Sequence, residues 1–99
     1  MGAFVYMLQC SDESYYVSSA TGDDLSRRIA EHQSGTYPEY TWSRRPVRLV
    51  WSEHFEQITD AIAAERKIKG WSRAKKEALI NGDWKRIQQL AGRRDRKST

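Results

Sequence analysis

The first part of the chain has the pattern of two short strands, because an apolar run of strand-forming residues is followed by a polar break and a second such run. Residues 4–8 read Phe-Val-Tyr-Met-Leu, a polar cluster occupies 11–14, and strand-forming residues resume at 15–17. This order predicts a β-hairpin. Because side chains of a strand point to alternate faces, the even-numbered residues of the first strand share one face: Phe4, Tyr6 and Leu8.

Apolar residues at helical spacing follow the hairpin. Leu25 and Ile29 lie four residues apart in a helix that Asp23 or Asp24 should cap and that should end near Gly35. The segment from 36 to 45 has the composition of a loop, and residues 47–51 predict a third strand.

A second helix is predicted with Thr59 or Asp60 as its cap, an apolar stripe through Ile58, Ile62 and Ile68, and an end at Gly70. A third helix should span 72–80, and a last one should run from 83 to about 90.

This order of elements, ββαβαα, predicts an α+β fold: a small three-stranded, mainly antiparallel sheet flanked by helices. The 99 residues leave room for one core only. We therefore expect one domain over residues 1–82, followed at 83–99 by a C-terminal helix and a basic tail that should be disordered.

The net charge of +4 is unevenly distributed. Residues 1–64 carry five Lys/Arg against nine Asp/Glu, whereas residues 65–99 carry twelve against four. A basic end suits a polyanion such as nucleic acid, although a solvated basic face with a frayed tail is an equal alternative on charge alone. A single cysteine, Cys10, and the lack of a signal peptide or a long apolar run predict a soluble cytoplasmic protein.

Two polar groups fall where helices should be apolar. Arg28 and His32 lie on the same side of the first helix as Leu25 and Ile29, and Glu65 lies within the apolar stripe of the second. A buried carboxylate needs compensation, so Glu65 either forms an internal ion pair with Arg28, binds a metal, serves catalysis or becomes protonated. Tyr6 and Tyr16 can approach across the hairpin, either as plain packing or as part of a polar cluster.

Five segments together resemble a known family. They are Phe4-Val5-Tyr6, Tyr16-Val17-Ser18, the helix from Leu25 to His32, the single Glu65, and the basic stretch 67–80. In order and spacing they resemble the GIY-YIG nuclease domain over residues 3–82, and in particular its small stand-alone bacterial branch, the UPF0213 proteins.

The resemblance implies hydrolysis of DNA phosphodiester bonds with one divalent cation, Mg²⁺ or Mn²⁺. It assigns Tyr6 as general base, Tyr16 as a contact to phosphate and nucleophile, Arg28 as stabiliser of the phosphoryl transition state, His32 as proton relay or phosphate contact, and Glu65 as metal ligand. Branched, damaged or single-stranded DNA is the expected substrate, with RNA left open. We further expect a monomer that acts in DNA repair.

Basic residues outside that set predict a track for the nucleic-acid backbone: Arg27, Arg44, Arg45, Lys67, Lys69, Arg73, Lys75 and Lys76. Tyr37, Tyr40 and Trp42 either stack on unpaired bases or fill a loop against the core. No base-reading motif is present, so recognition should depend on backbone and shape and not on sequence.

The chain departs from the family pattern at three places. Phe4 and Ser18 stand where the two motifs have glycine, and the loop over 19–24 is about two residues longer than usual. The Ser18 hydroxymethyl group could crowd the phosphate. The alternative function is therefore a catalytically impaired nucleic-acid-binding module, and a third reading is an interaction scaffold.

Overall fold

The computed structural model describes residues 2–22, 25–35 and 41–90. It divides into two compact units, Met1–Lys69 and Gly70–Thr99, which are described separately. The expected domain limits of 1–82 and 83–99 stay a prediction. Several expectations lie outside the described residues: the caps Asp23 and Asp24, the aromatics Tyr37 and Tyr40, and the basic tail at 93–97.

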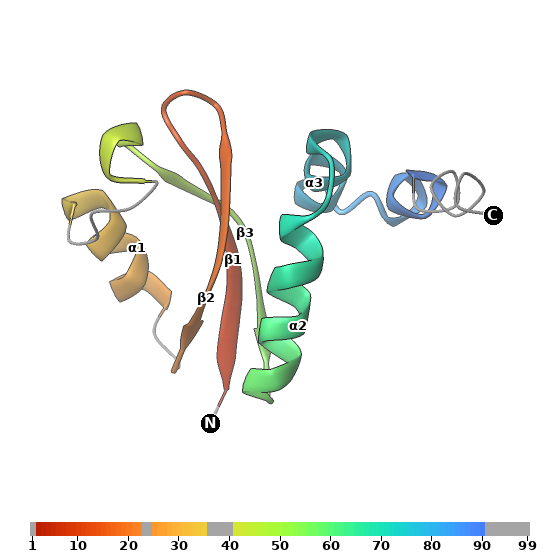
Figure 1. The fold of residues 1–99 in the computed structure, drawn as a ribbon, viewed down its shortest axis with the longest axis horizontal. Coiled ribbons are helices and arrows are strands. Elements are labelled where there is room, and N and C mark those ends of the chain that lie inside the picture. Colours follow the sequence, from red (N-terminus) through yellow and green to blue (C-terminus); the bar gives the residue numbers. More distant parts are fainter. Residues whose placement is uncertain (1, 23–24, 36–40, 91–99) are drawn as a thin grey trace. The chain divides into compact units, whose positions relative to one another are not determined.

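The first unit contains a three-stranded antiparallel sheet with the order β2-β1-β3 (Figure 1). Its strands are β1 (Ala3–Gln9), β2 (Tyr15–Thr21) and β3 (Arg48–Phe55). The central strand β1 has an unbroken apolar run and is buried from Val5 to Leu8. The predicted α+β fold is thereby confirmed, with β2 and β3 at the two edges of the sheet.

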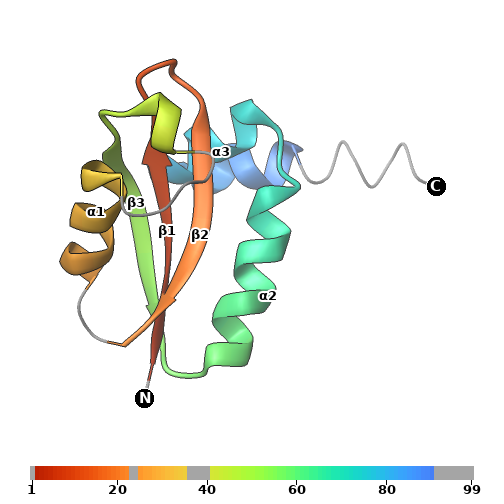
Figure 2. The same cartoon turned by 60° about the vertical axis from the view of Figure 1, so that its left-hand side comes forward.

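Helices α1 (Leu25–Ser34) and α2 (Ile58–Lys69) cover opposite faces of the sheet (Figures 1 and 2). Leu25 and Ile29 of α1 pack on a cluster that includes Tyr6 and Leu8, the predicted even-numbered face of β1. Helix α2 lies along the other face, close to β2 and β1. The alternation of β1 therefore supplies both helices with an apolar surface.

The start and the buried stripe of α2 differ from the prediction. The helix begins at Ile58, before the expected caps, and the carbonyl of Gln57 accepts the first helical N–H bonds, from Asp60 and Ala61. Ala61 and Ile68, seven residues apart, are the buried residues of α2, whereas Ile58 and Ile62 are exposed. The small side chain of Ala61 permits close contact between helix and sheet, which rotates the apolar stripe away from Ile62.

A short 3₁₀ helix, η1 (Trp42–Arg44), occupies the end of the predicted loop. The side-chain amide of Gln33, near the end of α1, accepts a hydrogen bond from the Val47 N–H at 2.9 Å and donates to the Val47 carbonyl at 2.5 Å. This pair of bonds connects α1 to the residue that precedes β3. It therefore fixes where the third strand enters the sheet.

The second unit contains α3 (Arg73–Ile80) and a helical stretch at 84–90. The Ser72 hydroxyl caps α3 by accepting the Lys75 N–H, and Gly82, at a φ of +68°, lies in the turn that follows. Asp83 accepts the Arg86 N–H at the start of the next helix. The expected limits of α3 and the expected start of the next helix agree with these caps. Within the described ranges, no helix has the length and apolar character needed to cross a membrane.

Candidate active site

Three buried side chains form a hydrogen-bonded chain between β1, α1 and the residue that precedes η1. The Tyr6 hydroxyl is 2.9 Å from His32 Nε2, and His32 Nδ1 is 2.9 Å from the Thr41 hydroxyl. All three residues are buried, with Tyr6 and Thr41 completely so. Because burial of a polar group costs free energy unless it is hydrogen-bonded, this chain accounts for the imidazole on the core side of α1.

Both ring nitrogens of His32 are hydrogen-bonded in this chain, so the positions of the protons on Tyr6, His32 and Thr41 depend on one another. A neutral imidazole donates from one nitrogen and accepts at the other, so the direction of one bond sets the direction of the next. Thr41 was not among the sequence candidates. The sequence before it has no periodicity, and no helical or strand spacing relates Thr41 to His32.

Tyr16 joins this cluster from the edge strand. Its ring meets the His32 ring edge-on, with centroids 5.4 Å apart, and it lies diagonally across the hairpin from Tyr6. Tyr16 is half-buried whereas Tyr6 is inaccessible. The structure therefore brings together three of the five predicted catalytic residues, and Tyr16 is the phenol among them that reaches the surface.

Arg28 lies on the same side of the sheet, nearer the end of β2. It lines a shallow surface hollow together with Ala20 and Thr21 of β2 and with Arg27 and Glu31 of α1. Arg27 is largely exposed and lies 3.8 Å from Glu31. The half-buried position of Arg28 beside a strand edge allows its guanidinium to meet an anion that enters the hollow.

Glu65 lies on α2 with its side chain only 17% exposed and 2.7 Å from the Lys69 ammonium. Partial burial acts to raise the pKa of Glu65, but hydrogen bonds from Lys69 and from the Ser19 hydroxyl, with the charges of Lys69 and Arg66, outweigh it and lower the pKa. The carboxylate is thus held ionised. The expected internal pair with Arg28 is not formed: Glu65 pairs instead with Lys69, a partner that the sequence analysis did not name.

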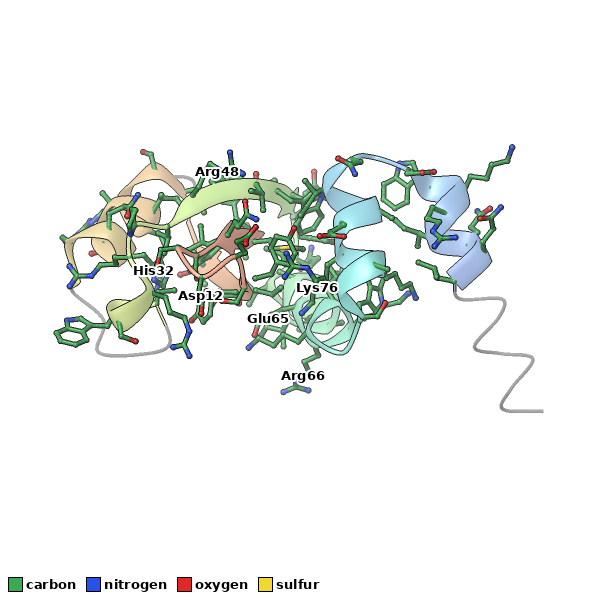
Figure 3. The ribbon with its side chains drawn as sticks, turned by 90° about the horizontal axis from the view of Figure 1, so that it is seen from above. Asp12, His32, Arg48, Glu65, Arg66 and Lys76 are labelled. Carbon is green, nitrogen blue, oxygen red and sulfur yellow. The ribbon has the colours of Figure 1, made fainter. Side chains whose placement is uncertain are left out.

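Arg28 and Glu65 are separated because their helices cover opposite faces. Ser19 and Ala20 are neighbours on β2, yet Ser19 contacts Glu65 and Ala20 borders the Arg28 hollow. Figure 3 shows His32 and Glu65 on the two sides of the sheet. Because β2 is an edge strand, both groups border the same rim of the sheet. The five predicted residues therefore do not form one closed pocket.

A single cation with few protein ligands fits this site. In the part of the chain that the structure describes, no three His, Cys, Asp or Glu side chains gather in a group that could hold a metal ion. The ionised Glu65 carboxylate and the Ser19 hydroxyl are oxygen donors, the type that Mg²⁺ and Mn²⁺ prefer. Such a site is weak until water and a phosphate complete the coordination.

Several residues of the predicted backbone track are engaged by the protein itself. Arg44 pairs with Asp12 at 3.1 Å and Arg73 with Glu77 at 3.2 Å. Lys75 is buried, with its Nζ 4.4 Å from the centre of the Trp71 ring. Lys76 is half-buried. The other members of the track are exposed: Arg27, Arg45, Lys67 and Lys69.

Ser18 lies directly opposite Tyr6 in the β1–β2 pairing and is half-buried. Among the described non-glycine residues, Glu13 is the one with a positive φ, so the backbone at Ser18 has no need of glycine. If Ser18 lowers activity, it must do so by crowding a ligand and not by straining the backbone.

The sequence of the chain is similar to that of known proteins. The GIY-YIG catalytic domain matches residues 2–78. A UPF0213 protein of Natronomonas pharaonis is 44% identical over 77 residues, which is 78% of this chain and 88% of that protein. A UPF0213 protein of Listeria monocytogenes is also 44% identical over 77 residues, covering 78% of this chain and 84% of the relative.

Two solved structures share the fold. The solution structure of a UPF0213 protein from Bacillus halodurans is 38% identical, with a TM-score of 0.54 and coverage of 91% of this chain and 97% of the other. That of a protein from E. faecalis is 36% identical, with a TM-score of 0.57 and coverage of 83% and 85%.

Proposed function

The chain belongs to the GIY-YIG family, in its UPF0213 branch, and on this premise we propose that it is a metal-dependent endonuclease acting on DNA. The family indicates a nuclease-type function, a nucleic-acid substrate and use of a divalent metal. The observation that carries the proposal is the placement of Arg28 and an ionised Glu65 on either side of the β2 rim, with Tyr16 on the same strand.

In this proposal the scissile phosphate lies along the rim of β2. Arg28 donates to its non-bridging oxygens, where negative charge grows as the phosphodiester bond breaks. No side chain at the rim belongs to a base-reading motif, so the phosphate backbone and the shape of the substrate direct binding.

Tyr16 is the phenol that handles the proton of the attacking water, because it is the accessible tyrosine of the cluster. Tyr6 has no contact with solvent, so we assign it, with His32 and Thr41, to positioning: the buried chain holds the His32 ring against the Tyr16 ring.

Glu65 and the Ser19 hydroxyl would hold the divalent cation. When bound, such a cation polarises a phosphoryl oxygen and lowers the pKa of water. The sequence expectation of Mg²⁺ or Mn²⁺ fits the oxygen donors of this pair.

Cleavage of labelled DNA tests the proposal. Single-stranded, duplex and branched forms are incubated with the protein and Mg²⁺ or Mn²⁺. Arg28→Ala and Glu65→Gln should each lower the rate by about 100-fold. Arg48→Ala is the matched control, because Arg48 is an exposed arginine on β3, the other edge strand of the sheet. Cleavage that persists in Glu65→Gln and Arg28→Ala would show that the reaction occurs elsewhere.

A nucleic-acid-binding module without efficient cleavage is the second candidate, and Ser18 opposite Tyr6 is the observation that favours it. Ser18→Gly distinguishes the two, since the backbone at this position accepts either residue. A gain in cleavage of tenfold or more would identify the wild type as impaired. Robust cleavage that is unchanged by the substitution would exclude this candidate.

The remaining expectations are monomeric state, a place in the cytoplasm and a role in DNA repair. The pKa of the Cys10 thiol is raised, and burial is the largest cause of this shift. The thiol is therefore protonated in the core, which suits a reducing compartment but does not require one.

A further inference from the structure

Trp42 is exposed on a segment that is otherwise tightly held. Its side chain lies on η1 and is 52% exposed. The guanidinium carbon of Arg45 is 5.5 Å from the centre of the indole ring, and Arg45 Nε donates to the Trp42 carbonyl at 2.8 Å. An indole and a guanidinium thus form one exposed aromatic and cationic surface.

The segment that carries Trp42 is fixed at three neighbouring points. Thr41 is hydrogen-bonded to the buried His32, the Arg44 carbonyl accepts the Ser11 N–H at 2.9 Å, and Arg44 pairs with Asp12. The indole is therefore presented by a backbone that needs little ordering when a ligand binds, which removes part of the entropic cost of binding.

The end of α1 leaves room for this pair of side chains. A Cβ at Gly35 would lie 2.8 Å from Arg45 Nη1 and 3.2 Å from Trp42 Cδ1, and Gly35 has a φ of +79°. Arg45 Nη1 also donates to the Gln33 carbonyl at 3.4 Å. The glycine therefore lets the guanidinium lie against the end of the helix beside the indole.

Arg45 differs from three other basic residues of the first unit in its partners. Arg27, Arg44 and Lys69 each pair with a carboxylate. Over the described residues, Arg45 hydrogen-bonds to carbonyl oxygens and pairs with no carboxylate. A guanidinium held beside an exposed indole complements a ligand that has both negative charge and a flat ring.

We propose that Trp42 and Arg45 form a subsite for one unpaired nucleobase and its phosphate. The inference rests on the proposed function and specifies its substrate: a nucleic acid with at least one unstacked nucleotide near the cleavage site. Stacking of a base on an aromatic side chain requires a free base face, which an intact duplex does not offer. Thr41 links the subsite to the site through its hydrogen bond to His32.

Binding of an oligonucleotide tests this subsite directly. A single-stranded 12-mer with one 2-aminopurine and the same 12-mer in a duplex are titrated with wild type, Trp42→Ala, Trp42→Phe and Arg45→Met. Stacking on the indole quenches 2-aminopurine fluorescence in the single strand. Trp42→Ala should bind the single strand about tenfold more weakly and lose the quenching, whereas Trp42→Phe should keep part of both. Duplex affinity should change by less than twofold.

Salt dependence separates the two side chains. Trp42→Ala should leave the slope of log Kd against log salt unchanged, because stacking releases no counterions, whereas Arg45→Met should make it shallower by about 0.7. Trp84→Ala is the matched control, because it removes another exposed indole, 58% exposed, in the second unit. Thermal unfolding of each variant verifies the fold.

Two results would overturn the subsite. One is single-strand affinity and quenching in Trp42→Ala equal to those of wild type, and the other is an equal loss in Trp84→Ala. If Arg28→Ala still abolishes cleavage in those cases, the proposed function stands without this subsite. A wild type that binds neither form of the probe and cleaves no DNA would remove both proposals.

Discussion

At the scale of single residues, Glu65 is the side chain whose environment matters most for the proposed chemistry. Its carboxylate is ionised because Lys69 and Ser19 donate to it, and Lys69 occupies one carboxylate oxygen. A divalent cation at the proposed site would therefore compete with an ammonium group for Glu65. If Glu65 holds the cation as proposed, Lys69 would be displaced and would become available to a phosphate at the same rim.

Replacement of Lys69 by methionine should raise the affinity for Mn²⁺ in the absence of DNA. Two unit charges 4 Å apart in water interact by about 1 kcal/mol, so loss of the competing ammonium should tighten binding by about fivefold. Paramagnetic resonance of free Mn²⁺ measures this without any cleavage. Lys67→Met, which removes an exposed lysine of the same helix, is the control, and equal tightening in both variants would contradict a specific role of Lys69.

The effect of Lys69→Met on stability should depend on pH. Because Lys69 helps to lower the folded-state pKa of Glu65, its contribution to stability is complete above the unfolded pKa of about 4.3 and is lost as pH falls through the lowered value. Lys69→Met should therefore be less stable than wild type at pH 7, and the difference should shrink as the solution is acidified below pH 4.

The residue assignments show what sequence alone could and could not provide. The motif spacing selected Tyr6, Tyr16 and His32, and the structure places these three together. Spacing could not reveal that Tyr6 is sealed from solvent or that Thr41 completes its hydrogen-bonded chain, because both depend on the packing of η1 against α1. The catalytic roles themselves remain predictions.

At the scale of elements, the connection between α1 and β3 depends on one side chain. Gln33 satisfies both the N–H and the carbonyl of the buried Val47, which a neighbouring strand would otherwise do. The orientation of η1, and with it the position of Trp42, follows from this connection and from the Arg44 contacts with the hairpin turn.

Gln33→Ala should therefore lower the free energy of unfolding by about 1–3 kcal/mol, because it leaves two backbone groups of Val47 without partners. Urea denaturation followed by tryptophan fluorescence measures the loss. Gln89→Ala, which removes an exposed amide at 84–90, should change stability by less than about 0.5 kcal/mol. A Gln33→Ala protein as stable as the control would show that water replaces the amide.

Element limits were predictable where local chemistry determines them. Ser72 and Asp83 cap helices as their side chains suggest, and Gly35 and Gly82 follow helix ends with positive φ. The start of α2 and its buried face were not, because the fit of Ala61 against the sheet outweighs the larger apolar area of Ile62. Hydrophobic size alone does not indicate which side of a short helix can approach a sheet.

At the scale of the whole molecule, the two compact units differ in charge. Residues 1–69, which contain the candidate active site, carry eight Lys/Arg against ten Asp/Glu, whereas residues 70–99 carry nine against three. The second unit should therefore provide most of the sequence-independent electrostatic attraction for nucleic acid, whereas the first unit contains the residues proposed to cleave it. The sequence revealed this asymmetry, but not that Arg28 and Glu65 lie on different faces.

Replacement of Arg93, Arg94, Arg96 and Lys97 by glutamine should weaken DNA binding and flatten its salt dependence. For single-stranded DNA, the slope of log K against log salt should fall by about 0.7 for each of these side chains that contacts a phosphate. Cleavage at saturating DNA should not change. A variant with lysine in place of the three arginines keeps the charge, so a flattened slope in that variant would contradict a purely electrostatic contribution.

The alternation of β2 limits which changes of length this protein can tolerate. Ser19 contacts Glu65 and Ala20 borders the Arg28 hollow because consecutive residues of a strand face opposite ways. One residue inserted between Val17 and Ser18 would exchange these two environments and turn the Ser19 hydroxyl away from α2. Relatives that keep this chemistry should therefore gain or lose residues at the 11–14 turn, and not singly within the strand.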